Sequence, residues 1–265
     1  MIAYLGDTRS RKLLARIDAM HNSRARAPMR VGQVVVRGRL ELWLRGRGSA
    51  ADPKRWCYDN GAWADHVAAR DFDETGWCAD IQQIVALPTA RQPDFAVLPD
   101  RVAGGAASLA LSLLWLARLG RPLSWYLAVQ DGTAPTDVPD HPWLDGIFLG
   151  GSTAWKLATM GRWAEWCRGR GLPLHVGRVG TMRRVASCLA HDVASCDSAL
   201  PLFSEDNWQR FFAALTATQQ RLPFCRDAQP WSQAARPSPR TAAALAAPCS
   251  PRASRERPPT PKHQE

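Results

Sequence analysis

Long apolar runs are absent from this 265-residue sequence. No stretch approaches the roughly 18 consecutive apolar residues that a membrane-spanning helix requires. The N-terminal residues 1–12 also lack the charged and apolar segments of a secretory signal. We therefore expect a soluble, cytoplasmic protein with no membrane partner.

Closely spaced cysteine pairs are absent as well. None of the seven cysteines forms a Cys-x-x-Cys pair, and an odd count in a chain without an export signal indicates reduced thiols. Cys188, His191 and Cys196 have a spacing that resembles part of a metal site, but zinc takes four clustered ligands and no fourth is suggested. We predict no bound metal and no cofactor.

Lysine is scarce, since only four of the 34 basic residues are Lys. The net charge of +10 is also unevenly distributed: residues 9–55 carry 13 Lys or Arg against three acids, whereas residues 56–225 carry 14 against 17. A basic flank beside an acidic centre fits a polyanion that is guided toward a site built from carboxylates. An arginine-rich composition explains the same numbers without such a partner, so both interpretations stand.

The composition changes at residue 226. Residues 226–265 hold eight prolines and almost no large apolar residue, which is typical of a disordered tail. Residues 1–225 show no internal repeat and no second linker. With 46% hydrophobic residues and 12 Trp in the whole chain, we predict one folded domain at 1–225 with a sizeable core.

Short apolar runs alternate with segments of helical character through this domain. Strands are predicted at residues 3–6, 33–38, 55–59, 94–100, 124–131, 145–151, 172–180 and 194–200. Helices are predicted at residues 10–20, 73–86, 105–120, 152–171, 181–192 and 204–222, with none between the second and third strands. Apolar strands that alternate with helices form parallel sheets, and eight of them predict a small α/β fold, the (β/α)8 TIM-like barrel.

Polar residues or a Gly pair end six successive strands. They are Asp59-Asn60-Gly61, Asp100, Gln130-Asp131, Gly150-Gly151, Arg178 and Asp197. The chemistry of such barrels takes place at the carboxyl ends of the strands, so these residues would meet in one mouth. Any single Asp also fits a turn or a helix cap, but together they predict an active site.

Three of these positions carry a second interpretation. Gly150 and Gly151 fit a phosphate-binding turn or a close approach to a flat ligand, and equally a tight turn with Ser152 as helix N-cap. Gln130 ends an apolar strand, so its amide must find partners once it is buried, and a ligand edge offers them. For His175, the pattern favours a hydrogen-bonded histidine inside the barrel over a catalyst.

Six motifs, in this order, resemble the tRNA-guanine transglycosylases. They are Asp59-Asn60-Gly61-Ala62-Trp63, FAVLPD (95–100), LAVQDG (127–132), IFLGGSTAWK (147–156), HVGRVG (175–180) and CDSALP (196–201). The chain is most similar to the small transglycosylase-like proteins of phages and bacteria that insert 7-deazaguanines into DNA. The resemblance covers about residues 1–215 and leaves out the tail.

The resemblance implies a pentosyltransferase that replaces guanine in DNA with a free 7-deazaguanine, such as 7-cyano-7-deazaguanine. Asp197 would be the nucleophile that attacks C1′ and forms a covalent aspartyl-glycosyl intermediate. Asp59 would be the general acid and base, and two inversions would return the original anomer. The nucleotide must be flipped or unpaired, so accessory proteins that open the duplex are possible partners.

The resemblance also implies a set of substrate-binding residues, namely Asp100, Gln130, Gly150, Gly151, Asn60 and Arg178. Among them, Asp100 and Gln130 would read the purine edge, and the backbone of the Gly pair would contact the base.

Two departures from the family are visible. The tRNA enzymes carry a Cys/Cys/Cys/His zinc subdomain after the sixth or seventh strand, and residues 172–205 supply none, which favours DNA over tRNA. Asn60-Gly61-Ala62 replaces the Ser-Gly-Gly of the tRNA enzymes, so the identity of the incoming base stays open. The alternatives are exchange on RNA, a catalytically silent barrel that binds nucleic acid, and a glycosidase whose carboxylate pair is Asp59 and Asp197.

Overall fold

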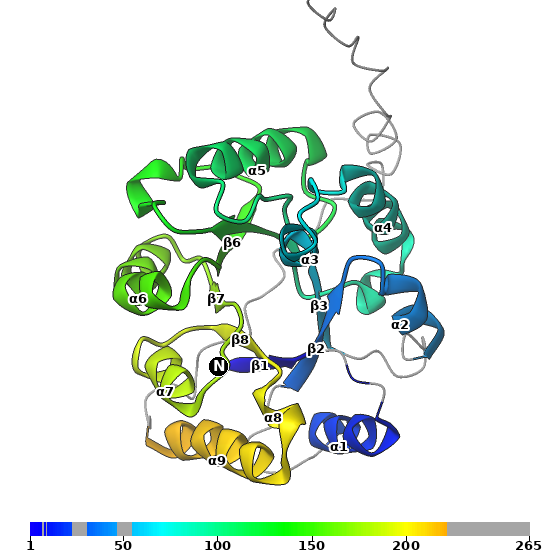
Figure 1. Ribbon diagram of the computed structural model, residues 1–265, viewed down its shortest axis with the longest axis vertical. Coiled ribbons are helices and arrows are strands. Elements are labelled where there is room, and N and C mark those ends of the chain that lie inside the picture. The colour runs from blue at the N-terminus through cyan, green and yellow to red at the C-terminus, as the bar shows by residue number, and fades with distance from the viewer. Residues whose placement is uncertain (7, 9, 23–30, 47–54, 222–265) are drawn as a thin grey trace, which may run out of the picture.

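The strands of this protein close into a parallel barrel. The computed structural model describes residues 1–6, 8, 10–22, 31–46 and 55–221, so the tail predicted at 226–265 lies outside the described residues. Within them, the strands follow one another around the barrel in sequence order from β1 to β8, and β8 pairs with β1. Helices form a ring around the strands (Figure 1). The predicted (β/α)8 fold is confirmed.

Each of the eight predicted strands is present. They are β1 (Ile2–Leu5), β2 (Val31–Val36), β3 (Trp56–Asp59), β4 (Ala96–Val97), β5 (Trp125–Val129), β6 (Leu144–Leu149), β7 (Leu174–Val176) and β8 (Ser195–Ser198). Every adjacent pair is parallel, so the carboxyl ends of all eight strands lie at the same end of the barrel.

The six predicted helices are also present, as α1 (Arg11–Asn22), α4 (Glu74–Ala86), α5 (Gly105–Leu119), α6 (Thr153–Gly169), α7 (Met182–Ala190) and α9 (Glu205–Arg221). The structure adds the short helices α2 (Leu40–Gly46), α3 (Ala62–Val67) and α8 (Leu200–Phe203), and the 3-10 turns η1 (Thr89–Arg91) and η2 (Pro135–Asp137). No helix in the described part of the chain combines the length and the apolar composition needed to cross a membrane.

The expectation that no helix lies between the second and third strands was wrong. Helix α2 occupies this connection and buries Leu40 and Trp43, which are three residues apart on one face. A helix of seven residues offers too few apolar positions for its period to emerge from the sequence.

Side chains alternate between the inside of the barrel and the layer beneath the helices. Tyr4, Cys57, Tyr126 and Ala128 belong to a small cluster inside the barrel. Their neighbours along the strands, such as Trp125, belong to the larger core between barrel and helices. This two-residue period is the geometry of a β-strand, and it decides which residues point inward.

Aromatic rings fill the barrel interior because glycines make room for them. A Cβ atom on Gly146 would lie 2.5 Å from the ring of Tyr126, and one on Gly32 would lie 2.7 Å from the ring of Tyr4. A Cβ atom on Gly177 would lie 2.7 Å from the ring of Phe148. These rings leave no space for an added methyl group.

We predict that Gly146→Ala lowers the free energy of unfolding by about 1–3 kcal/mol, because the new methyl group overpacks the barrel against Tyr126. Urea denaturation measures the change. The matched control is Gly169→Ala near the end of α6, where an added Cβ meets nothing within 4 Å and should cost nothing. Equal stability of the two variants would contradict this account of the interior.

Candidate active site

Two carboxylates lie at the carboxyl end of the barrel. Asp59 is the last residue of β3, and Asp197 is the next-to-last residue of β8. Asp59 lies two residues after Cys57 on β3, and Asp197 lies two residues after Ser195 on β8. Because side chains two residues apart point to the same side of a strand, both carboxylates point toward the barrel interior, as Cys57 and Ser195 do. The two predicted catalytic residues therefore share one end of the barrel.

Asp197 is held at both of its carboxylate oxygens. Oδ1 accepts a hydrogen bond from the backbone N–H of Arg178 at 2.9 Å, and Oδ2 lies 3.2 Å from Nε2 of His175. Its side chain is 17% exposed, whereas His175 is fully buried. The carboxylate is thus fixed from below and open on one side toward the mouth.

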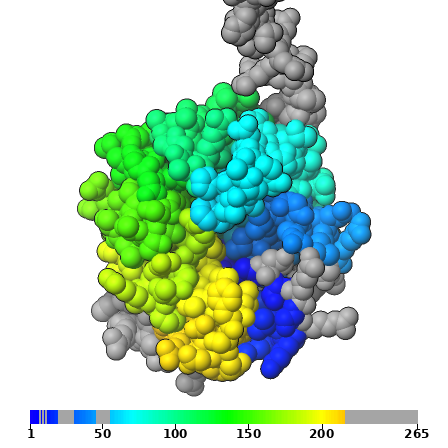
Figure 2. Space-filling view, in the orientation of Figure 1, coloured from blue at the N-terminus to red at the C-terminus, as the bar shows by residue number. Residues whose placement is uncertain are grey.

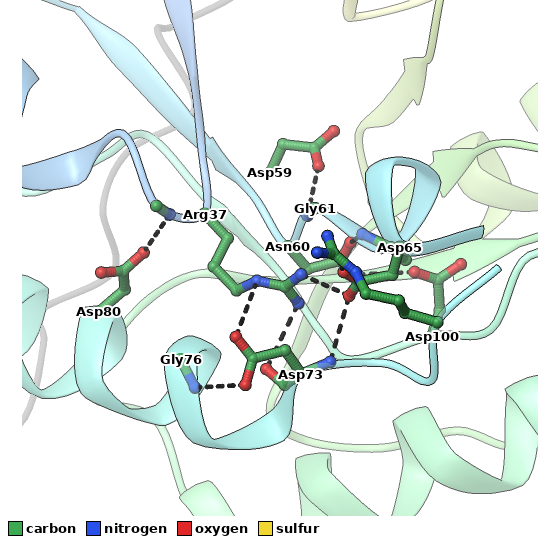
Figure 3. Close-up of polar contacts among 12 residues, drawn as sticks. Arg37, Asp59, Asn60, Gly61, Asp65, Asp73, Gly76, Asp80 and Asp100 are labelled. Atoms are coloured by element: carbon green, nitrogen blue, oxygen red, sulfur yellow. Dashed lines mark hydrogen bonds and ion pairs between the residues drawn. The ribbon is translucent and has the colours of Figure 1, made fainter. Parts of the chain in front are cut away.

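Asp59 is held by its own turn. Its Oδ1 accepts a hydrogen bond from the N–H of Gly61 at 2.7 Å, and Gly61 adopts a left-handed φ of 76° that favours glycine (Figure 3). Burial raises the pKa of Asp59, and the nearby charge of Asp197 raises it further, while the Gly61 N–H opposes the rise. Compared with an exposed Asp, this carboxyl group is easier to protonate.

Arg178 links its own loop to α3 and to the turn before α6. Its backbone has a left-handed φ of 55°, which is uncommon for a residue other than glycine. Its guanidinium lies 4.0 Å from the ring centre of Trp63 in α3 and donates to the carbonyl of Gly151 at 2.9 Å. In the space-filling view, the cyan region that includes α3 and the yellow region that includes α7 and α8 approach each other in the middle of this face (Figure 2).

Asn60, Asp100 and Gln130 form a buried network beside the two carboxylates. The amide of Asn60 donates to Oδ1 of Asp100 at 2.6 Å (Figure 3). The amide of Gln130 donates to Oδ2 of the same carboxylate. The Oε1 atom of Gln130 accepts from the N–H of Ala103 at 2.8 Å. Burial raises the pKa of Asp100 to about 6. The buried amide of Gln130 therefore finds its partners within the protein.

The Gly150-Gly151 pair forms a tight turn into α6. Gly151 has a φ of 75°, and Ser152 caps the helix by accepting a hydrogen bond from the N–H of Trp155. The carboxylate of Asp131 accepts from both the N–H and the hydroxyl of Ser152, at 2.6 and 2.5 Å. The tight-turn interpretation is confirmed, and the start of α6 already carries a carboxylate where a phosphate would bind.

An ion-pair cluster supports the loop that carries Asp59. Arg37, which follows β2, pairs with Asp65 of α3 and lies 3.7 Å from a carboxylate oxygen of Asp73 (Figure 3). Burial would raise the pKa of Asp65, but hydrogen bonds from Arg37 and from the N–H of Asp73 hold it below its usual range. The backbone N–H of Arg37 also donates to the carbonyl of Asp59 at 3.0 Å.

Part of the basic flank is paired with acidic side chains of the protein itself. The described arginines of residues 9–55 that form ion pairs with acidic side chains are Arg16, Arg37, Arg45 and Arg55. Residues 23–30 and 47–54 of this flank lie outside the described residues. These pairs neutralise part of the positive charge of the flank, so that part attracts a polyanion less strongly.

Two residues of the site were not predicted as functional. His175 is the interior histidine that the sequence predicted, but one of its partners is Asp197. Lys156 is buried in α6, and its ammonium group donates to the carbonyl of Gly177, next to Arg178. The sequence held a signal for it, because Lys156 falls at helical spacing with the buried Met160 and Trp163.

A hollow of about 410 Å³ lies away from this site. It opens near Leu144, which begins β6, and Leu172, which precedes β7, and is lined also by Trp166 and Arg170. None of the predicted site residues lines it. Among the residues that the structure describes, no group of three or more His, Cys, Asp or Glu could hold a metal ion, and Cys188 and Cys196 are buried free thiols.

No model of a known protein family matches this chain, and no curated protein matches it at a significant level. The resemblance to the transglycosylases therefore stays a prediction from the sequence motifs.

We predict that Asp100→Asn lowers the free energy of unfolding by about 2 kcal/mol at pH 7, because the new amide N–H₂ would face the donor of Asn60 or that of Gln130. Urea denaturation measures the loss. The control is Asp140→Asn, since Asp140 pairs with Arg170 on the surface with a side chain 85% exposed, and its replacement should change the value by less than about 0.5 kcal/mol. An unchanged stability for Asp100→Asn would show that the network contributes nothing.

Lys156 should give the protein a distinct pH dependence. Burial, aided by the charge of Arg178, lowers the pKa of Lys156 from 10.5 to about 8. Between these values the unfolded chain binds more protons than the folded one, so the free energy of unfolding rises with pH. From pH 7.5 to 9.5 we expect wild type to gain about 2 kcal/mol relative to Lys156→Met. Lys12→Met, at an exposed position, should follow wild type, and a parallel pH dependence of wild type and Lys156→Met would contradict the burial of this charge.

Proposed function

We propose that this protein is a base-exchange transglycosylase that replaces guanine in DNA with a free 7-deazaguanine. The observation that supports this function is the presence of Asp59 and Asp197 at one end of the barrel in different environments. Asp197 accepts a hydrogen bond from the N–H of Arg178 at one oxygen and lies within hydrogen-bond distance of His175 at the other, whereas Asp59 sits in its own turn with a raised pKa. Two carboxyl groups in contrasting environments suit the separate roles of nucleophile and acid.

In the first step, a carboxylate oxygen of Asp197 attacks C1′ of the target nucleotide. The bond from C1′ to N9 breaks, and its electron pair leaves with guanine. Asp59 in its protonated form donates a proton to the departing purine, which its raised pKa favours. The products are free guanine, an ionised Asp59 and a sugar bound covalently to Asp197.

In the second step, the incoming 7-deazaguanine occupies the place of guanine. Ionised Asp59 takes the proton from N9, and N9 attacks C1′ from the face that guanine left. The bond from C1′ to Asp197 breaks, which restores the carboxylate. Asp59 ends with the proton with which it began, and two inversions retain the anomer.

The purine would be recognised by the buried network. Guanine presents N–H donors at N1 and the 2-amino group and an acceptor at O6. Asp100 offers carboxylate oxygens and Gln130 an amide, which bind each other in the free protein. Trp63 adds a half-exposed aromatic face at the same mouth, which suits stacking on a base.

The decisive test uses a single-stranded DNA oligonucleotide with labelled guanine and free 7-cyano-7-deazaguanine. Wild type should release the label and insert the new base, and a denaturing gel should show a covalent protein–DNA adduct. We predict that Asp197→Asn abolishes exchange and adduct while its Kd for DNA stays within about twofold of wild type, because the nucleophile is lost and its volume is kept. Mass spectrometry of the digested nucleosides identifies the product.

The control is again Asp140→Asn, which lies away from the mouth and should exchange like wild type. If Asp197→Asn still exchanges labelled guanine, the role of Asp197 is wrong. If wild type exchanges guanine in RNA strands of the same sequence and not in DNA, the substrate is RNA. Salt-sensitive DNA binding without any adduct would indicate a catalytically silent barrel that binds nucleic acid. Release of sugar from oligosaccharides without base exchange would indicate a glycosidase.

A further inference from the structure

A chain of three side chains leads from the barrel interior to the mouth. Ser195 and Asp197 are two residues apart on β8, so both point inward, and His175 on β7 pairs in register with Ser195. The imidazole therefore lies between them. Its Nδ1 is 2.9 Å from the hydroxyl of Ser195, and its Nε2 is 3.2 Å from Oδ2 of Asp197.

In a serine hydrolase the serine faces the substrate and the aspartate is buried, whereas here the aspartate is the exposed group and the serine is buried. Ser195 is 3% exposed and His175 is fully buried, while the side chain of Asp197 is 17% exposed. A substrate at the mouth meets the carboxylate and not the hydroxyl. Ser195 and His175 can therefore act on a substrate only through Asp197.

Aromatic rings hold the imidazole in place. The ring of His175 stacks on Phe148 at a centroid distance of 4.8 Å and an angle of 24°. Phe95 and Tyr4 flank it at 5.1 and 5.9 Å. Between these walls the ring can turn little, so its two nitrogens stay directed at their partners.

The network selects one tautomer of the ring. If the Ser195 hydroxyl donates to Nδ1, the proton of the neutral ring lies on Nε2 and is donated to Asp197. The other tautomer would turn a lone pair of Nε2 toward the carboxylate, which is repulsive. The acceptor at Nε2, Asp197, and the donor at Nδ1, Ser195, therefore both favour the tautomer with its proton on Nε2.

We propose that His175 and Ser195 are positioning residues that hold Asp197 for its attack on C1′. The proposal rests on the proposed function. His175 fixes Oδ2 while the N–H of Arg178 fixes Oδ1, so the carboxylate plane is set before the substrate arrives. Lys156 supports the second donor, because it binds the carbonyl of Gly177 next to Arg178.

The kinetic test compares four variants in the guanine-exchange assay. We expect His175→Leu and Ser195→Ala to lower kcat roughly 10- to 100-fold with KM for DNA within about twofold of wild type, because orientation and not binding is lost. His175→Gln keeps an N–H donor and should recover part of the rate. Ser187→Ala is the matched control, since Ser187 lies in α7 with its hydroxyl directed at the sulfur of Met160 and not at the loop of Arg178, and it should exchange like wild type.

A second measurement does not depend on activity. Imidazole ¹⁵N spectra of the wild-type protein should show the proton of His175 on Nε2, and Ser195→Ala should change the tautomer population while Ser187→Ala does not. Wild-type kcat in folded His175→Leu and Ser195→Ala, or a proton on Nδ1 in wild type, would overturn the positioning role. If wild type exchanges no base while the spectra agree, the proposed function fails and the arrangement around Asp197 stands.

Discussion

The inside of a small eight-stranded barrel must be filled by side chains that fit without crowding, and this constraint shapes the whole molecule. Here the rings of Tyr4, Tyr126 and Phe148 fill it, each lying against a glycine that has no Cβ and stands on a neighbouring strand or directly after it. The same inward phase that places these rings carries Asp59 and Asp197 to the carboxyl end. The alternation of side chains along the strands therefore decides both how the interior is packed and where the two carboxylates lie.

Polar groups occur inside the barrel at two levels. Toward the amino ends of the strands, the hydroxyl of Tyr4 donates to Asp94 at 2.5 Å, and Arg55 pairs with the same carboxylate. Aromatic rings and His175 lie above this layer, followed by the carboxylates of the mouth. The aromatic layer beneath the mouth helps to bury the groups next to it, and burial is the largest cause of the raised pKa of Asp59.

The sequence predicted the strands well because each is a short apolar run, and local alternation is readable without partners. It failed at α2, where seven residues carry too little periodicity, and it left the Gly150-Gly151 turn open between two interpretations. The structure decided this turn because Asp131, on a different loop, binds Ser152. Lys156 was missed because lysine is usually an exposed residue. Its burial follows only from its place on the apolar face of α6.

Local alternation in the sequence is enough to predict which residues end the strands, and in a parallel barrel Asp59, Asp100, Gln130 and Asp197 then lie at the same end. Their contacts become visible in the closed barrel: Asp100 and Gln130 bind each other, while Asp197 contacts His175. The physical reason is that inward or outward direction follows from the local geometry of a strand. A hydrogen bond between strands depends instead on the register at which the barrel closes, which no single segment encodes.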